Sequence, residues 1–386
     1  MQLKDIPGHE NLKNHFEMSA TQGRIPHAQL FVGDEGSGTL PLALAYASHV
    51  LSLEHEKESE SWQNCLQKCE NLIHPDLHFV FPTATNQEIK TNTISDAFLP
   101  QWRQFIKTQP FGSLYDWYQY LGIEKKQGFI RVEDSHEVIR KLSLKSYEGG
   151  YKIMLIWMAE KMNTEASNKL LKLIEEPTQK TLIILISADE SQLLQTIQSR
   201  CQIIRIPKFP EVVIEKYLTE KFQRTPFDSR KIAIQADGNL NKAIELLNPD
   251  VEKDGFEDRF VRWVRMAFGA KGNKSSVLGL IEWAEELAST GRETQKKFLG
   301  FCTEMFRQAI LINKGCKDLV FYQSKNGKFD LNKFAPFVHS GNIFDIYEAL
   351  QTAGLHIERN GNAKIVLADL SLKLTRLLHQ KPNEQL

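Results

Sequence analysis

The sequence predicts an α/β domain with a parallel sheet, followed by all-α domains. Two apolar runs, at residues 153–158 and 182–186, are too short for globular helices and show almost no alternation of apolar and polar residues. This pattern is typical of strands that are buried on both faces of a parallel sheet. From about residue 250 onward, apolar residues recur at helical spacing instead. The clearest stripes are Phe298, Cys302, Met305, Ala309 and Ile312, and Leu367, Leu370, Leu374, Leu377 and Leu378.

The N-terminal part predicts an amphipathic helix within residues 1–28, a buried strand over 29–32 and a helix over about 39–52. The loop between strand and helix contains Gly33, Gly36 and Gly38. Strand, glycine loop and helix are the context of a phosphate-binding loop, whose pattern is GxxxxGK followed by Ser or Thr. Thr39 stands where the phosphate-binding lysine belongs, and Leu40 where the Mg²⁺-binding hydroxyl belongs. We therefore predict that the loop keeps its turn but binds no ATP.

The central segment predicts a helix between the two apolar runs. Asn163 is a favourable N-cap residue and Pro177 ends the run. The residues between them that fall on one helical face are Ala166, Leu170, Leu173 and Ile174. A short helix is expected over about residues 190–198, and a third buried strand at 203–206.

This central segment resembles the core of bacterial clamp-loader subunits, a branch of the AAA+ ATPases. The matching residues are Asn168, Leu170, Leu171, Lys172, Glu175, Glu176, Pro177, Thr196, Ile197, Ser199, Arg200 and Cys201. The resemblance implies an AAA+ P-loop-type sheet domain over residues 1–207 and a small helical lid of three short helices over 208–250. It also implies a helical collar over 251–386 that holds the subunits in a ring. Residues 84–128 exceed the family pattern and are an insertion.

The resemblance also implies catalytic residues that this chain lacks. An active family member ends the strand at 153–156 with Asp-Glu, which hold Mg²⁺ and polarise the attacking water; here Trp157 and Met158 stand there. Glu160 lies two residues late for this role. The threonine pair after the next strand is Ser187-Ala188, and the lid arginine is Asn241. Together with Thr39 and Leu40, these changes predict a subunit that does not hydrolyse ATP and needs no bound cofactor.

One motif with a chemical role is retained, Ser199-Arg200-Cys201. The resemblance implies that Arg200 reaches the ATP of a neighbouring gamma/tau motor subunit, with Ser199 and Cys201 as supporting residues of the motif. Arginine suits this role because its guanidinium is permanently charged and binds phosphate oxygens in a planar fork. The alternative is a surface arginine favoured by the dipole at a helix C-terminus.

Family members often carry a small zinc module of four cysteines before a His-Pro-Asp tripeptide. This chain keeps His74-Pro75-Asp76 but has two cysteines, Cys65 and Cys69, at a different spacing. Cys65, Cys69 and His74 are the candidate zinc ligands, with His55 or His78 as a fourth. The interpretation that we favour is a decayed site in which His74 and Asp76 cap the turn before a strand at 77–81.

The insertion is rich in aromatic residues, and these are Trp102, Phe105, Phe111, Tyr115, Trp117, Tyr118 and Tyr120. Exposed aromatics among basic residues could stack on single-stranded nucleic acid. The basic residues here are few and scattered, and these are Arg103, Lys107, Lys125 and Lys126. We therefore predict an insertion that packs on the edge of the domain.

The composition of the 386 residues is that of a globular protein, with 41% hydrophobic and 25% charged residues. No apolar run reaches the roughly 20 residues that cross a bilayer, and the first residues lack the apolar region of a signal peptide. The five cysteines provide no disulfide framework. These features predict a cytoplasmic protein without a membrane partner. Lys+Arg and Asp+Glu both number 48, and this neutral balance favours binding to proteins first over strong independent DNA binding.

The resemblance implies a role in the DNA polymerase III clamp loader, which places the β sliding clamp on primer-template DNA. This chain would be a non-hydrolysing subunit that contacts gamma/tau on one side and the delta subunit on the other. The first alternative is a divergent motor ATPase of the gamma/tau type. The second is a nucleic-acid-binding module built from the cysteine–histidine segment and the aromatic insertion.

Overall fold

The computed structural model describes residues 1–247, 255–316, 319–322 and 329–381. It divides into two compact units, one of residues 1–123 and 128–247, the other of residues 124–127 and 248–386. Residues 208–247 of the predicted lid fall within the first unit, together with the sheet. Its last three residues, 248–250, lie outside the described residues. The finer division into three domains at residues 207 and 250 stays a prediction.

The first unit contains a five-stranded parallel sheet of order β2-β3-β4-β1-β5. Its strands are β1 (Ala28–Val32), β2 (Leu77–Val80), β3 (Lys152–Trp157), β4 (Thr181–Ser187) and β5 (Gln202–Arg205). In the central register, Leu30 pairs with Leu185 on one side and with Ile203 on the other. The five predicted strands are confirmed, with ends that differ by at most one residue.

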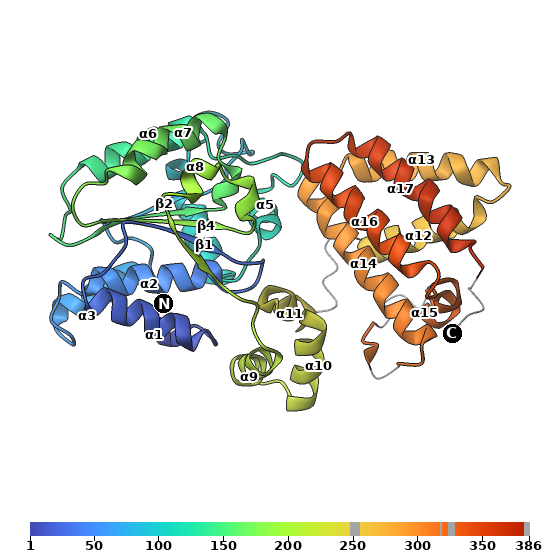
Figure 1. Ribbon diagram of the computed structural model, residues 1–386, viewed down its shortest axis with the longest axis horizontal. Helices are drawn as coiled ribbons and strands as arrows, with labels where there is room; N and C mark the ends of the chain where they lie inside the picture. The colour runs from blue at the N-terminus through green and yellow to red at the C-terminus, as the bar shows by residue number, and fades with distance from the viewer. Residues whose placement is uncertain (248–254, 317–318, 323–328, 382–386) are drawn as a thin grey trace. The chain divides into compact units, whose positions relative to one another are not determined.

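Both faces of the sheet are buried, as the continuous apolar runs predict. Along β3, Ile153, Leu155 and Trp157 join one core cluster, whereas Met154 and Ile156 join another. Figure 1 shows the two helical layers on opposite sides of the sheet. One layer is α1 (Glu10–Thr21), α2 (Thr39–Ser52) and α3 (Glu60–Glu70); the other is α6 (Val132–Ser143), α7 (Thr164–Glu175) and α8 (Gln195–Gln198).

The helix predicted after Asn163 is α7, and its cap is confirmed. The Ala166 N–H donates to Asn163 Oδ1 at 2.8 Å. The single helix predicted over about residues 190–198 is wrong. Leu193 and Leu194 are extended, with ψ of 149° and 133°, and they separate a 3₁₀ turn at Glu190–Gln192 from α8. The Gln198 amide donates to the carbonyls of Glu190 and Leu193, which stabilises this break.

The insertion contains α4 (Leu99–Thr108) and α5 (Leu114–Leu121). Paired backbone hydrogen bonds of 3.1 and 3.2 Å between Thr83 and Phe129 close its base. The insertion follows β2, the edge strand of the sheet, but it is more than a surface layer. Trp102, Phe105, Trp117 and Tyr118 belong to the same core cluster as α2, whereas Phe111 belongs to the cluster of the lid. Of the seven, Tyr120 is the exposed one, at 39%. Burial of the others removes the stacking surface that a nucleic-acid-binding module would need.

Three short helices form the predicted lid, α9 (Glu211–Phe222), α10 (Pro226–Ala236) and α11 (Leu240–Leu247). They share a small apolar core of their own, which includes Ile214, Leu218 and Ala233. The predicted number of helices is therefore confirmed for the described residues of this segment.

The second unit is a helical bundle, as its apolar stripes predict. Its longer helices are α12 (Phe256–Gly269), α13 (Lys274–Ala288), α14 (Arg292–Asn313), α16 (Ile343–Glu358) and α17 (Ala363–Leu378), with the short α15 (Leu331–Phe334) between α14 and α16. In both predicted stripes most residues are buried, while Ile312 and Leu377 are partly buried. Trp263 stacks on Trp283 in this core, with ring centroids 4.9 Å apart. Among the described residues, none of the helices combines the length and the apolar character needed to cross a bilayer.

Candidate functional site

The glycine loop after β1 keeps the turn of a phosphate-binding loop. Gly36 and Gly38 have φ of +72° and +83°, in the left-handed region that glycine adopts without strain. Gly38 is the N-cap of α2, and Pro41 lies in the first turn, where it costs no hydrogen bond. The Thr39 hydroxyl lies 2.8 Å from the Ser37 hydroxyl. The turn is thus built from local contacts that need neither the lysine nor a phosphate.

The loop lines a cavity of about 40 Å³, which has room for a few water molecules. The structure brings together here most of the positions that the sequence singled out. They are the loop residues Gly33, Gly36, Gly38, Thr39 and Leu40, the residues Trp157 and Met158 at the end of β3, and Ser187 and Ala188 at the place of the family's threonine pair. Asn241 is not among the lining residues. The insertion supplies the remaining wall through Pro110, Phe111, Gly112 and Ser113.

Strand β3 brings no carboxylate to this cavity. Trp157 is buried against the insertion, and its ring centroid lies 5.1 Å from that of Trp102. Glu160 is the first carboxylate after the strand, and it does not line the cavity. It accepts a hydrogen bond of 3.3 Å from the Ala188 N–H instead. Burial raises the pKa of Glu160 above its usual value, which favours the uncharged acid over a metal ligand.

Arg200 lies at the surface, directly after α8, and its side chain is 37% exposed. Its Nε donates to Glu175 Oε1 at 2.5 Å, and its Nη1 donates to the Thr196 carbonyl at 2.9 Å. The Ser199 hydroxyl donates to the same carbonyl at 3.2 Å. Burial raises the pKa of Cys201 to about 12, so this thiol stays protonated near neutral pH. The motif thus holds one exposed permanent charge, Arg200.

Glu175 is a partner of Arg200 that the sequence analysis missed. It is the last residue of α7, and its side chain is 44% exposed. A signal was present, because Glu175 belongs to the same family segment as Arg200. Spacing alone does not reveal the contact, since the two residues are 25 positions apart and are joined through strand β4.

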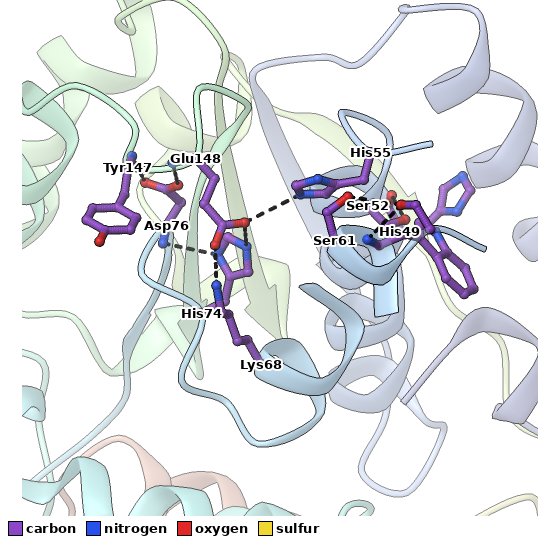
Figure 2. A network of polar contacts seen from close by, with 11 residues as sticks. His49, Ser52, His55, Ser61, Lys68, His74, Asp76, Tyr147 and Glu148 are labelled. Atoms are coloured by element: carbon purple, nitrogen blue, oxygen red, sulfur yellow. Dashed lines mark hydrogen bonds and ion pairs between the residues drawn. The ribbon is translucent and has the colours of Figure 1, made fainter. Parts of the chain in front are cut away.

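The structure brings the three predicted metal ligands together. Sulfur and nitrogen atoms of Cys65, Cys69 and His74 lie within 4.8 Å of one another. His55, Cys65 and Glu148 form a second, overlapping group. Glu148 is the residue that the sequence analysis missed, and Figure 2 shows its carboxylate between His55, His74 and Lys68. Lys68 Nζ donates to Glu148 Oε1 at 2.6 Å.

The hydrogen bonds of His74 do not suit a zinc ligand. Its Nδ1 accepts from the Asp76 N–H at 3.2 Å, and its Nε2 lies 3.0 Å from Glu148 Oε2. A neutral imidazole has one acceptor nitrogen. Because Nδ1 is that acceptor, Nε2 carries the proton, donates to Glu148 and has no lone pair for a metal. The two sulfurs suit zinc, but the four-ligand set is incomplete without a change of tautomer at His74.

Asp76 caps the segment before β3, whereas the interpretation that we favoured from the sequence had it cap the turn before β2. Its carboxylate oxygens accept from the N–H groups of Tyr147 and Glu148 at 2.7 and 3.0 Å. These bonds fix the backbone that carries Glu148 and thereby place its carboxylate beside His74. The turn is therefore held by hydrogen bonds among the residues of the chain itself.

A parallel sheet whose first strand enters a helix through a glycine loop, with a helical lid beside it, defines an α/β protein of the AAA+ P-loop type. The family described as DNA polymerase III, delta subunit matches residues 8–210. The chain belongs to this clamp-loader family. Several relatives that match are named DNA polymerase III subunit delta', which agrees with the resemblance seen in the sequence.

The curated relatives match part of this chain. Subunit delta' of Bacillus subtilis is 31% identical over 233 residues, which is 60% of this chain and 57% of that protein. Subunit delta' of Pseudomonas aeruginosa is 40% identical over 84 residues, 22% of this chain and 26% of that protein. A gamma-subunit-related protein of Thermotoga maritima matches in structure with a TM-score of 0.37 and 12% identity, over 94% of this chain and 99% of that chain. The matched part thus spans less than two thirds of the curated relatives.

Proposed function

We propose that this chain is the non-hydrolysing delta-prime subunit of a DNA polymerase III clamp loader. In this role it helps to load the β sliding clamp onto primer-template DNA in the bacterial cytoplasm. It contacts a gamma/tau motor subunit on one side and the delta subunit on the other. It supplies Arg200 to the ATP site of the motor subunit and binds no nucleotide itself. Polymerase activity belongs to the holoenzyme.

The observation that carries this proposal is the exposed guanidinium of Arg200 in the retained family motif. Its Nε and Nη1 are hydrogen-bonded within the chain, while the side chain remains 37% exposed. An arginine that acts on a neighbour needs this combination of a fixed position and an open face. The glycine loop supports the other half of the proposal, because Thr39 and Leu40 offer neither a cation nor a metal-binding hydroxyl at the required positions.

The proposed chemistry occurs on the neighbour's ATP. Water attacks the γ-phosphorus, the bond to the β–γ bridging oxygen breaks, and negative charge spreads over the phosphoryl oxygens. The Arg200 guanidinium stabilises this charge through a planar fork of N–H donors and transfers no proton. Glu175 is a positioning residue, because it holds Nε and leaves the outer part of the guanidinium for phosphate.

The decisive experiment is the clamp- and DNA-stimulated ATPase activity of the reconstituted loader. Arg200→Ala is expected to lower turnover by about 10³-fold, the order of magnitude of a trans-acting arginine finger. Arg200→Lys is the matched control, because it keeps the charge but loses the fork, and it should restore little activity. Equal assembly of the three complexes is checked by size-exclusion chromatography. Unchanged turnover in Arg200→Ala would reject the role in trans.

The rival function, a motor ATPase of the gamma/tau type, is separated by a nucleotide titration. The isolated full chain is titrated with a fluorescent ADP, and no saturable binding is expected in the micromolar range. Saturable binding would favour the motor, whatever the result for Arg200.

A further inference from the structure

The segment between α4 and α5, residues 109–113, contributes residues 110–113 to the lining of the same cavity as the glycine loop. We propose that this segment, together with Asp116 in the first turn of α5, is a built-in cover. It occupies the open side of the former nucleotide pocket and fastens the lid helices to the sheet domain. The inference rests on the proposed absence of nucleotide at this loop. It assigns to the insertion the bridging role that a bound nucleotide would otherwise have.

Phe111 is the apolar part of the cover. It is 7% exposed and belongs to the core cluster of the lid. Its ring makes edge-on contacts with Phe209 and Tyr217, at centroid distances of 6.3 and 5.9 Å. It also reaches the loop, since a Cβ atom added at Gly38 would lie 3.6 Å from its ring. One side chain of the insertion thus contacts both the lid and the glycine loop.

Asp116 is the polar part of the cover. Its Oδ2 accepts from the Asn241 amide at 2.8 Å, and the same oxygen accepts from the N–H and hydroxyl of Ser113 at 2.8 and 2.7 Å. Asn241 stands in α11, at the position where the resemblance places the lid arginine. In place of a cation directed at phosphate, the lid presents an amide that is hydrogen-bonded to the insertion.

The lid also contacts the loop directly. The Leu240 N–H donates to the Gly36 carbonyl at 3.0 Å. The Asn239 side chain lies so close to Gly36 that an added Cβ atom would be 1.9 Å from its Oδ1. Likewise, a Cβ atom at Gly38 would lie 2.7 Å from the ring of Phe209. Close packing of the lid therefore favours glycine at both positions, which gives the two glycines a role without phosphate.

The cover is supported by contacts between α5, α4 and strand β3. Trp117 Nε1 donates to the Pro82 carbonyl at 2.9 Å, and its ring stands edge-on to Trp102 at 5.3 Å. Trp102 in turn packs on Trp157 of β3. Trp157, at the position where the resemblance places a metal-binding acid, is thus part of the support for the insertion. This continuity predicts that the lid is held closed in the chain without any ligand.

Amide hydrogen exchange of the full chain tests the cover. Phe111→Ala should make the protected amides of α9 and α11 exchange about tenfold faster or more, because it removes the apolar contact that holds the lid. Asn241→Asp is the second variant, since it sets a carboxylate against Asp116 without removing core volume, and it should act in the same direction. Tyr147→Ala is the matched control, because that aromatic side chain is 81% exposed; it should leave lid exchange unchanged.

The outcomes separate the cover from the proposed function. Faster exchange confined to the lid and the glycine loop, in both variants, supports the cover. Unchanged lid exchange in both, or an increase spread over the whole first unit, overturns it and makes Phe111 an ordinary core residue. Saturable binding of fluorescent ADP by the wild-type chain would overturn both the cover and the proposed loss of nucleotide binding. Loss of the cover alone would leave the role of Arg200 in place.

Discussion

The glycine loop and the Arg200 motif differ in their exposure to solvent and in the side chains that surround them. The loop is enclosed by its own chain, with Trp157 and Phe111 where a nucleotide-binding protein needs acids and open space. Arg200 is held by two hydrogen bonds yet keeps 37% of its side chain exposed. Both regions fall within the part of the chain that the family matches, but only in the second does the residue with the proposed chemical role remain exposed.

This difference indicates which kind of site is expected to be repacked when it no longer binds its ligand. A buried site that no longer binds its ligand leaves polar groups and space unfilled, and both are costly, so apolar side chains and internal hydrogen bonds replace them. A surface site that acts on another molecule has no such cost, because water solvates its charge. Internal replacement is therefore expected at the glycine loop and at the cysteine–histidine turn, but not at Arg200.

The largest effect is expected from restoring an acid at the end of β3. Trp157→Asp removes a ring packed against Trp102 and Phe105 and buries a carboxylate without a cation. The free energy of unfolding should fall by at least about 4 kcal/mol. Urea unfolding followed by circular dichroism measures this, with Trp157→Phe as the control that keeps an apolar aromatic ring but loses part of the volume, at about 1–2 kcal/mol. A loss below about 1 kcal/mol for Trp157→Asp would show that this pocket is not fixed by the insertion.

The sheet could be predicted from the sequence because buried parallel strands are short continuous apolar runs, as at residues 182–186. The cap at Asn163 follows from local chemistry. The cover could not be predicted, because Phe111 and Phe209 are almost 100 positions apart and either could have packed elsewhere in a core. Glu148 carries no local signal either. Its role depends on where β2 and β3 place His74 beside it, which only the folded chain decides.

A smaller effect is expected at Glu160. Burial raises its pKa in the folded state, so the native protein binds this proton more tightly than the unfolded chain does. Its contribution to stability is therefore present at low pH and is lost as the pH rises above the unfolded value of about 4.3. Glu160→Gln mimics the protonated acid and should raise the free energy of unfolding at pH 8 by about 1 kcal/mol. The gain should vanish below about pH 4.

Unfolding midpoints of the wild-type chain and of Glu160→Gln, taken between about pH 4 and pH 8, measure this difference in stability. Glu137→Gln provides a comparison at a carboxylate that pairs with Arg140 on the surface of α6, where no gain is expected. A variant Glu160→Gln that is less stable at pH 8 would show that the carboxylate is ionised, as a metal ligand would be.

The smallest effect is expected from removal of metal. This experiment tests whether internal hydrogen bonds take the place of a ligand at the cysteine–histidine turn, as we expect at the glycine loop. Since His74 donates to Glu148, the turn should be stable without zinc, and a chelator should shift the unfolding temperature by less than about 1 °C. Metal analysis of the purified chain should find no stoichiometric zinc.

Glu148→Gln should instead lower the free energy of unfolding by about 1–2 kcal/mol, because it weakens a charge-assisted bond to Lys68. One zinc per chain, lost together with stability in Cys69→Ser, would mean that His74 changes its tautomer and that this buried site has kept its ligand.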